Sequence, residues 1–288
     1  MKAIGVFFSV ALACGAGDAS AAALSCSPAL NTPQAPFRIY GNSYYVGTHG
    51  VASVLITSPR GHVLIDGDLA LSAPMIAAHI RALGFRIEDV KLILNTHVHC
   101  DHAGGIAALQ RMSGADVKAS PASAAVLEEG GVAKDDPQYG SVAPPPPVAH
   151  VSAIANGETL HVGLIAITAH FTPGHTEGGT SWTWESCENG RCLHLVDGDS
   201  LTAVSGPAYR FSDHPAVLAQ FEQGFAVMAG LPCDILITAH PELNGLWSRL
   251  DRRTQGDPGA LIDPGACRRY ATRMRAGLAR RLASEKTQ

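Results

Sequence analysis

The stretch THVHCDH at residues 96–102 constrains this sequence more than any other, and it continues directly from the apolar run VKLILN. Three histidines, a cysteine and an aspartate crowd into the positions from His97 to His102. The 288-residue chain holds only 13 histidines, so chance alone would rarely place three in such a window. A strand-length apolar run that ends in a group of electron-pair donors predicts a buried strand leading into a metal site.

The composition is that of a globular domain with a large core, because 46% of the residues are hydrophobic and only 16% are charged. The formal net charge is −4 and the sequence shows no basic run, which argues against nucleic acid as a partner. Aromatic residues make up 6% of the chain, too few to suggest a platform for stacking bases.

The first residues, MKAIGVFFSVALACGAGDASAAALS, have the layout of a secretory signal. Lys2 provides a short positive region, and the apolar stretch from Ala3 to Ala13 is too short to span a bilayer. The small residues Ala19 to Ala21 fit a signal-peptidase site. We expect residues 1–21 to be a signal peptide and residues 22–288 to form a single domain. The mature protein is then expected to be periplasmic and monomeric, with no membrane contact after cleavage.

Export makes disulfide bonds permissible, and two pairs of cysteines are suitably placed. Cys187 and Cys192 flank ENGR, in which Asn189-Gly190 is a strong type I′ hairpin signal, so we expect a bridge across that hairpin. Cys233 precedes the apolar run DILITA and Cys267 lies in an expected C-terminal helix. A bridge between them would close a loop of about 34 residues and stabilise the fold by roughly 3–4 kcal/mol.

Cys26 and Cys100 remain without obvious partners. Because Cys100 is out of step with the alternation of the histidines around it, we expect it to be a buried free thiol that points away from the metal.

Strand and helix signals alternate along the chain, which favours an α/β architecture. Strands are expected at FRIYG, SYYVGT, VASVLITS, HVLIDG, VKLILNT, ADVKAS, ETLHVG, LIAITAHF, TSWTWES, RCLHLVDG and DILITA. Helices are expected over 72–84 with Ser72 as N-cap, over 102–114, over 121–131, near 213–229, and from about 264 to the end. Two halves, each with strands first and helices after, suggest two sheets packed face to face with helices outside.

Residues 130–149, GGVAKDDPQYGSVAPPPPVA, carry no regular pattern and end in four prolines. An irregular loop of this size in a compact domain is more often functional than accidental, although a linker between two domains is the alternative.

The spacing within the histidine cluster predicts which side chains can share an ion. His97 and His99 lie two positions apart at the end of a strand, so their imidazoles point the same way, and Asp101 continues that alternation. His102 begins the next helix, where the chain changes direction. Imidazole and carboxylate are the ligands expected for zinc, and a catalytic zinc keeps one position open for water. Two groups that point in two directions suggest two ions.

THVHCDHAGG resembles the H-x-H-x-D-H signature of the metallo-β-lactamase superfamily. TPGHTEGGTSW, VDGDSLT and LITAHPEL resemble three further segments of that superfamily, so the likeness extends from about Pro36 to the C-terminus. It implies a four-layer αβ/βα sandwich of two mixed sheets, with a site for two zinc ions per chain at one edge of the sheets. The implied ligands are His97, His99 and His175 for one zinc, and Asp101, His102 and His240 for the other.

Details of the sequence resemble the third subclass of the β-lactamases in this superfamily. Two subclasses place a cysteine ligand where this chain has Ser200, whereas the third has a serine followed two residues later by serine or threonine, here Thr202. The loop ending in prolines is also similar. The resemblance implies an exported enzyme that hydrolyses the amide bond of β-lactams, carbapenems included, through a zinc-bound hydroxide and so confers antibiotic resistance. Asp101 would orient the hydroxide and pass on a proton, and Ser200 and Thr202 would bind the substrate carboxylate.

Asp199 supports an alternative, because GD before Ser200 resembles the metal-bridging aspartate of glyoxalase-II-type thioester hydrolases and lactonases. Adjacent strand residues face opposite sides, so we expect only one of the two to face the site, and we favour Ser200 because Thr202 shares its face. A third reading, a zinc-binding protein without turnover, is disfavoured because every ligand position is filled. Asp66 is expected either to brace the metal loop or to be a simple turn carboxylate.

Overall fold

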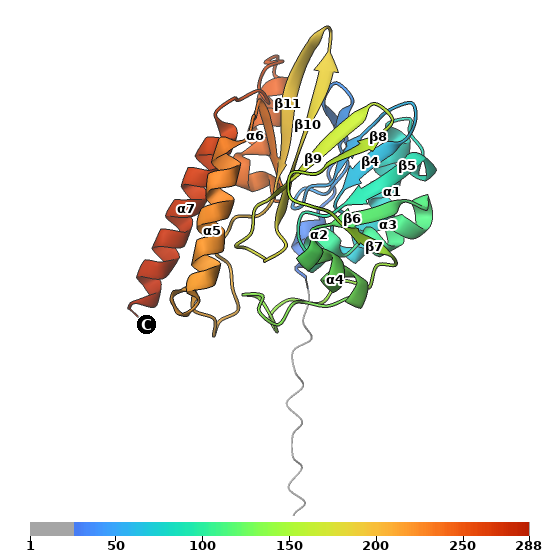
Figure 1. The fold of residues 1–288 in the computed structure, drawn as a ribbon. Coiled ribbons are helices and arrows are strands. Elements are labelled where there is room, and N and C mark those ends of the chain that lie inside the picture. The colour runs from blue at the N-terminus through green and yellow to red at the C-terminus, as the bar shows by residue number, and fades with distance from the viewer. Residues whose placement is uncertain (1–25, 288) are drawn as a thin grey trace, which may run out of the picture.

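The structure is a computed structural model that describes residues 26–287. Two mixed β-sheets pack face to face, and helices cover the outer face of each, so the chain forms four layers (Figure 1). The expected αβ/βα sandwich is confirmed. The predicted signal peptide, residues 1–21, lies outside the described residues. Within the described part, none of the helices is both long and apolar enough to cross a membrane.

The first sheet contains seven strands that lie side by side in chain order. They are β1 (Phe37–Tyr40), β2 (Ser43–Tyr45), β3 (Val54–Ile56), β4 (His62–Ile65), β5 (Val90–Leu94), β6 (Asp116–Ala119) and β7 (Val151–Ala153). The pairs from β1 to β4 are antiparallel and those from β4 to β7 are parallel. The parallel strands are joined through α1 (Ala73–Ala82), α3 (Ile106–Ser113) and α4 (Pro121–Glu129), whose apolar faces pack on the outer side of this sheet.

The second sheet has five strands in the order β12-β11-β10-β9-β8. They are β8 (Thr159–Val162), β9 (Ile165–Phe171), β10 (Thr180–Glu188), β11 (Arg191–Gly198) and β12 (Ile235–Thr238). Only the β11–β12 pair is parallel. The long helices α5 (Pro215–Gly230) and α7 (Ala266–Glu285) lie side by side on the outer face, drawn in orange and red in Figure 1.

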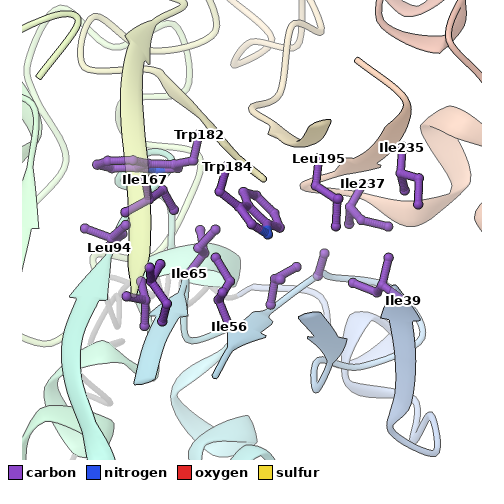
Figure 2. Packing of buried hydrophobic residues seen from close by; sticks show 14 of the residues in the cluster. Ile39, Ile56, Ile65, Leu94, Ile167, Trp182, Trp184, Leu195, Ile235 and Ile237 are labelled. Carbon is purple, nitrogen blue, oxygen red and sulfur yellow. The ribbon is translucent and has the colours of Figure 1, made fainter. Parts of the chain in front are cut away.

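The main core fills the space between the two sheets, as Figure 2 shows. Trp182 and Trp184 of the second sheet lie over Ile56 and Ile65 of the first, and Trp182 is fully buried. Removing a buried tryptophan side chain typically costs about 3–5 kcal/mol. The indole Nε1 of Trp182 also donates to the carbonyl of Asn95, 3.2 Å away, so the core holds the start of the histidine-rich segment in place.

All eleven expected strands are present, but the structure adds elements that the sequence patterns did not reveal. These are β7 in the first sheet and helix α6 (Leu246–Thr254). Five short 3₁₀ helices also occur within residues 26–287: η1 (Pro28–Asn31), η2 (Ala70–Ser72), η3 (Ile87–Asp89), η4 (Phe211–Asp213) and η5 (Pro241–Asn244).

Two expected helices differ in detail. The helix expected over 102–114 is two helices, α2 (Cys100–Ala103) and α3, with a break at Gly104-Gly105. A side chain at Gly105 would collide with the carbonyl oxygen of Gly67, so this close crossing requires glycine. Ser72 precedes α1 as expected, but its side chain does not cap the helix and instead contacts Asn31.

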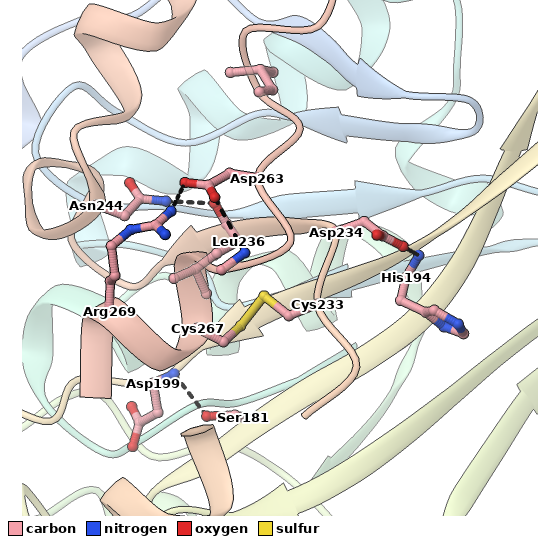
Figure 3. Close-up of a disulfide and its surroundings, with 12 residues drawn as sticks. Ser181, His194, Asp199, Cys233, Asp234, Leu236, Asn244, Asp263, Cys267 and Arg269 are labelled. Carbon is pink, nitrogen blue, oxygen red and sulfur yellow. Dashed lines mark hydrogen bonds and ion pairs between the residues drawn. A yellow bond between two sulfur atoms is a disulfide. The ribbon is translucent and has the colours of Figure 1, made fainter. Parts of the chain in front are cut away.

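Three disulfide bonds cross-link the described chain. Cys187 joins Cys192 across the β10–β11 hairpin, where Asn189 and Gly190 both have positive φ as a type I′ turn requires. Cys233 before β12 joins Cys267 at the start of α7, which fastens that helix to the sheet (Figure 3). Both are pairings that the sequence predicts.

The third disulfide joins Cys26 to Cys100, with 6.1 Å between their Cα atoms. The expectation that Cys100 is a free thiol is wrong. Strand β5 ends at Leu94 and Cys100 is the first residue of α2, so the alternation of a strand does not apply to it. The N-terminal segment therefore lies against the histidine-rich loop.

Candidate metal centre

The six side chains predicted to bind metal come together at one edge of the molecule, on segments that each follow a strand. Asp101 and His102 lie in the short helix α2, and the other four lie in loops. His97, His99, Asp101 and His102 follow β5 of the first sheet, whereas His175 follows β9 and His240 follows β12 of the second sheet. Their donor atoms form two groups, in each of which all atoms lie within 4.8 Å of one another. One group is His97, His99 and His175, and the other is Asp101, His102 and His240.

The first group consists of three buried imidazoles that meet edge to face. The ring centroids of His97 and His99 are 4.9 Å apart, and those of His97 and His175 are 4.8 Å apart. Burial, reinforced by the neighbouring imidazoles, lowers the pKa of His97 and of His175, so both rings are held neutral. The buried His97 Nε2 has no hydrogen-bond partner among the described residues. A neutral imidazole nitrogen without a partner is suited to binding a metal ion.

The second group brings a carboxylate against two imidazoles. The Nε2 atoms of His102 and His240 are 3.2 Å apart, and Asp101 Oδ2 lies 3.5 Å from each. Burial acts to raise the pKa of Asp101, but the adjacent His102 and His240 outweigh it and hold that pKa well below its usual range. Asp101 is therefore a carboxylate, the form in which it can bind a cation.

Four of the five imidazoles form a hydrogen bond through a second ring nitrogen to an oxygen atom outside the two groups. Such partners fix the orientation and tautomer of metal-binding histidines. The pairs are His97 Nδ1 with Asp199 Oδ1 (2.7 Å), His99 Nε2 with Asp136 Oδ2 (3.0 Å), His175 Nδ1 with the Thr202 carbonyl (2.8 Å) and His240 Nδ1 with the Gly50 carbonyl (3.1 Å). His102 Nδ1 lies 3.6 Å from Asp66 Oδ2, beyond hydrogen-bond distance. This arrangement, together with the donor types, fits a zinc centre.

Asp66 braces the loop that carries the first four of these side chains. Its carboxylate accepts hydrogen bonds from the Thr96 amide (2.8 Å), the Thr96 hydroxyl and the Asn95 side chain (3.0 Å). Because these bonds fix the chain just before His97, Asp66 has the bracing role, the first of the two alternatives that the sequence left open for it.

Asp199 corrects one expectation, namely that it would point away from the site while Ser200 faced it. Strand β11 ends at Gly198, so strand alternation does not govern these two residues. Asp199 contacts His97 from behind and is not one of the grouped donor atoms. Ser200 is fully buried, and its hydroxyl has no hydrogen-bond partner among the described residues. Thr202 is partly exposed and holds His175 through its carbonyl.

A groove of about 920 Å³ lies beside the three-histidine group. One wall comes from the irregular loop 130–149 and the other from residues 206–217, with Val98, Thr176 and Gly178 between them. Val98 lies between His97 and His99 in the chain and Thr176 follows His175, so the floor of the groove borders the three-histidine group. The volume is that of a site for a small-molecule ligand.

Asp136 and the Gly50 carbonyl belong to the centre but were not singled out from the sequence. Asp136 lies within the loop that was expected to be functional, although nothing in the pattern distinguishes it from the adjacent Asp135. A backbone carbonyl such as that of Gly50 leaves no sequence signal at all.

Comparison with solved structures finds close relatives. The Rm3 metallo-beta-lactamase is 53% identical, with a TM-score of 0.88 over 90% of this chain and 97% of that chain. MEM-A1, a subclass B3 metallo-beta-lactamase from a soil metagenome library, is 50% identical, with a TM-score of 0.87 over 90% of this chain and 99% of that chain. The metallo-beta-lactamase SMB-1 is 51% identical, with a TM-score of 0.87 over 89% of this chain and 99% of that chain.

More distant likeness exists to hydroxyacylglutathione hydrolases. That of Anaeromyxobacter dehalogenans is 32% identical over 184 residues, which are 64% of this chain and 56% of that enzyme. That of Rhodobacter capsulatus is 30% identical over 198 residues, 69% of this chain and 66% of that enzyme. The match therefore spans less than two thirds of either enzyme. The family model described as the metallo-beta-lactamase superfamily matches residues 46–194. This chain belongs to the metallo-β-lactamase superfamily, in its B3 subclass.

Proposed function

We propose that this protein hydrolyses the amide bond of β-lactam antibiotics, carbapenems included, with two zinc ions per chain. The observation that carries the proposal is the pair of donor groups, one of which borders an open groove, in a chain 50–53% identical to metallo-beta-lactamases over about 90% of its length. The two sets of donor atoms match the ligand types that zinc prefers.

We propose that His97, His99 and His175 hold one zinc and that Asp101, His102 and His240 hold the other. The neutral imidazoles of the first group and the carboxylate of the second support this division. When bound, a pair of zinc ions lowers the pKa of a water molecule toward neutrality and polarises a substrate carbonyl. The attacking water then needs no serine or cysteine nucleophile from the chain.

Asp101 is the residue we propose as catalytic beyond its role as a ligand. Its carboxylate is partly exposed, unlike the fully buried His102 beside it, so it can accept a hydrogen bond from an attacking water. It can then pass a proton to the nitrogen that leaves when the amide bond breaks.

Thr202 is our candidate for binding the substrate carboxylate, since it is partly exposed beside His175. Ser200 stays a weaker candidate for the same role, because its hydroxyl is fully buried.

We also propose that the protein is exported to the periplasm after removal of residues 1–21, acts there as a monomer and confers resistance to its substrates. Three disulfide bonds support an oxidising compartment.

Thioester or lactone hydrolysis is the alternative, and the similarity to hydroxyacylglutathione hydrolases favours it. The position of Asp199 weighs against it, because its carboxylate contacts the outer nitrogen of His97 instead of lying between the two donor groups.

The test is to assay the purified protein with a penicillin, a carbapenem and a hydroxyacylglutathione thioester, with and without a zinc chelator. We expect β-lactam turnover that chelation abolishes and zinc restores. His175→Ala should lose both turnover and one zinc, whereas His170→Ala, which alters a half-buried histidine outside both groups, should retain both zinc ions. Thioester turnover in a zinc-loaded protein that leaves both β-lactams intact would overturn the proposal in favour of the alternative.

A further inference from the structure

Asp136 is a buried carboxylate in the middle of the irregular loop 130–149. Its side chain is 5% exposed, and one carboxylate oxygen lies 3.0 Å from His99 Nε2. The other oxygen accepts the backbone amide of Gln138 at 2.7 Å. Among the described side chains, only that of His99 lies within hydrogen-bond distance of this carboxylate. One carboxylate thus joins the fold of the loop to the orientation of a metal-site histidine.

The loop has few other attachments to the rest of the molecule near this point. The hydrogen bonds of Asp136, Tyr139 and Ser141 amides go to carbonyls within the loop itself. Attachment to other segments comes from three consecutive positions: Asp136 to His99, the Pro137 carbonyl to the Gly206 amide (2.8 Å), and Gln138 Nε2, 3.4 Å from His99 Nδ1. Two of these three attachments end on the same histidine.

The hydrogen-bond partner of His99 comes from a different part of the chain than the partners of His97 and His175. His97 is held by Asp199 directly after β11, and His175 by a backbone carbonyl, that of Thr202. His99 alone of these three takes its partner from the irregular loop 130–149. The orientation of His99 therefore depends on the position of the wall of the groove.

We propose that Asp136 is a positioning residue that couples the loop 130–149 to the three-histidine group. Because it engages Nε2, it leaves Nδ1 as the His99 nitrogen that can bind an ion together with His97 and His175. An ion bound by this group and the closed position of the loop then favour each other, as two linked equilibria must. The inference rests on the proposed metal site but not on the choice of β-lactams as substrates.

The expected loss of zinc affinity can be taken from other proteins in which a metal-binding histidine has lost its hydrogen-bond partner. Removing the hydrogen-bond partner of a metal-binding histidine typically weakens metal affinity about 10–100-fold. By reciprocity, the loop should open more often by a similar factor when the ion is absent.

The test compares Asp136→Asn with Asp135→Asn in the full chain, since Asp135 is an exposed neighbour that forms no ion pair with a described residue. Zinc affinity is measured by competition with a chelator, and hydrogen exchange of residues 133–141 is measured with and without zinc. We expect Asp136→Asn to bind one zinc about 10–100-fold more weakly and to lose the zinc-dependent protection of the loop. Asp135→Asn should match the natural protein in both.

Unchanged zinc affinity and loop protection in Asp136→Asn would overturn the coupling, as would equal losses in Asp135→Asn. A protein that shows the coupling but turns over no β-lactam would refute the proposed function alone. Turnover of β-lactams with no effect of Asp136→Asn on zinc would refute the coupling alone.

Discussion

At the residue scale, Asp66 has a backbone φ of +59°, a conformation that residues other than glycine rarely adopt. Its carboxylate accepts hydrogen bonds from Asn95 and from the amide and hydroxyl of Thr96. Asparagine tolerates the same conformation and nearly the same space, but it presents an NH₂ group to these donors. We expect Asp66→Asn to lower the free energy of unfolding by about 1–3 kcal/mol, measured by urea denaturation. Asp116→Asn, an exposed aspartate at the start of β6, is the control, and an equal loss there would contradict the role of Asp66.

Single residues also show why part of the site could not be predicted. The spacing of His97 and His99, and the resemblance of the other motifs to those of the superfamily, predicted all six donors. This was possible because the type and order of the donor residues can be read directly from the sequence. The pairing of Cys26 with Cys100 could not be inferred, since it depends on where the N-terminal segment lies in space. The same holds for Asp136, whose role arises only when a loop folds back on His99.

At the scale of elements, the three disulfides should contribute unequally to stability. Cross-linking lowers the entropy of the unfolded chain more when the closed loop is longer, and the sequence separations are 74, 34 and 5 residues. We expect paired cysteine-to-serine replacements to cost about 4, 3–4 and 2 kcal/mol for Cys26–Cys100, Cys233–Cys267 and Cys187–Cys192. Urea denaturation of the three variants tests this order. A hairpin variant that is the least stable of the three would contradict it.

Glu285, near the end of α7, fastens that helix to η4. Its carboxylate accepts the amides of Phe211 (3.0 Å) and Ser212 (2.9 Å) and pairs with Arg281. Burial acts to raise the pKa of Glu285, but these hydrogen bonds outweigh it and lower the pKa to about 2. A carboxyl whose pKa is lower in the folded state than its ordinary 4.5 contributes stability above pH 4.5, and this is lost as the pH falls toward 2.

Glu285→Gln should therefore lower the free energy of unfolding at pH 7 by about 2 kcal/mol. The variant should also lose less stability than the natural protein between pH 4.5 and 2, as urea denaturation at several pH values would show. Glu222→Gln, which removes an exposed ion pair with Arg275, should change stability by less than about 1 kcal/mol. Equal pH dependence in Glu285→Gln and the natural protein would show that Glu285 has no such role.

The elements themselves were predicted where their patterns are strong and missed where they are weak. Apolar runs marked the buried strands of both sheets. Strand β7 has three residues, one half-buried and two exposed, so it lacks the alternation of apolar and polar residues that predicts a strand. Helix α6 is short and begins after Gly245 without a side-chain cap, so it lacks the usual start signal. It is fixed by tertiary contacts, such as those of Arg249 with the Ala260 and Leu261 carbonyls.

At the scale of the whole molecule, each donor group draws side chains from both sheets. His175 and His240 follow strands of the second sheet, and the remaining donors follow β5 of the first. A bound ion would therefore clamp the two halves and stabilise the folded state by about 2.7 kcal/mol when its free concentration is 100 times its Kd.

We expect the Tm in buffered zinc to exceed that of the metal-free protein by about 5–10 °C, with magnesium as the control ion. His175→Ala should lose a large part of this shift and His170→Ala should keep it. Zinc that bound without changing the Tm would mean that the unfolded chain binds it equally well, and this would contradict a site that only the folded arrangement of the two sheets creates.

The disulfide bond between Cys26 and Cys100 makes the order of oxidation and metal binding important while the protein folds. In the reduced chain, two thiols and Asp101 would offer a rival set of donors, since their ligand atoms lie within 4.8 Å of one another. Thiolates bind zinc as well as softer ions, so a metal held by the two sulfur atoms would compete with His102 and His240 for Asp101. Once the disulfide has formed, that competing set of donors no longer exists. A chain that meets an oxidant before it meets a metal therefore reaches the metal with Asp101 available to His102 and His240 alone, so the order of oxidation and metal binding affects how the site fills.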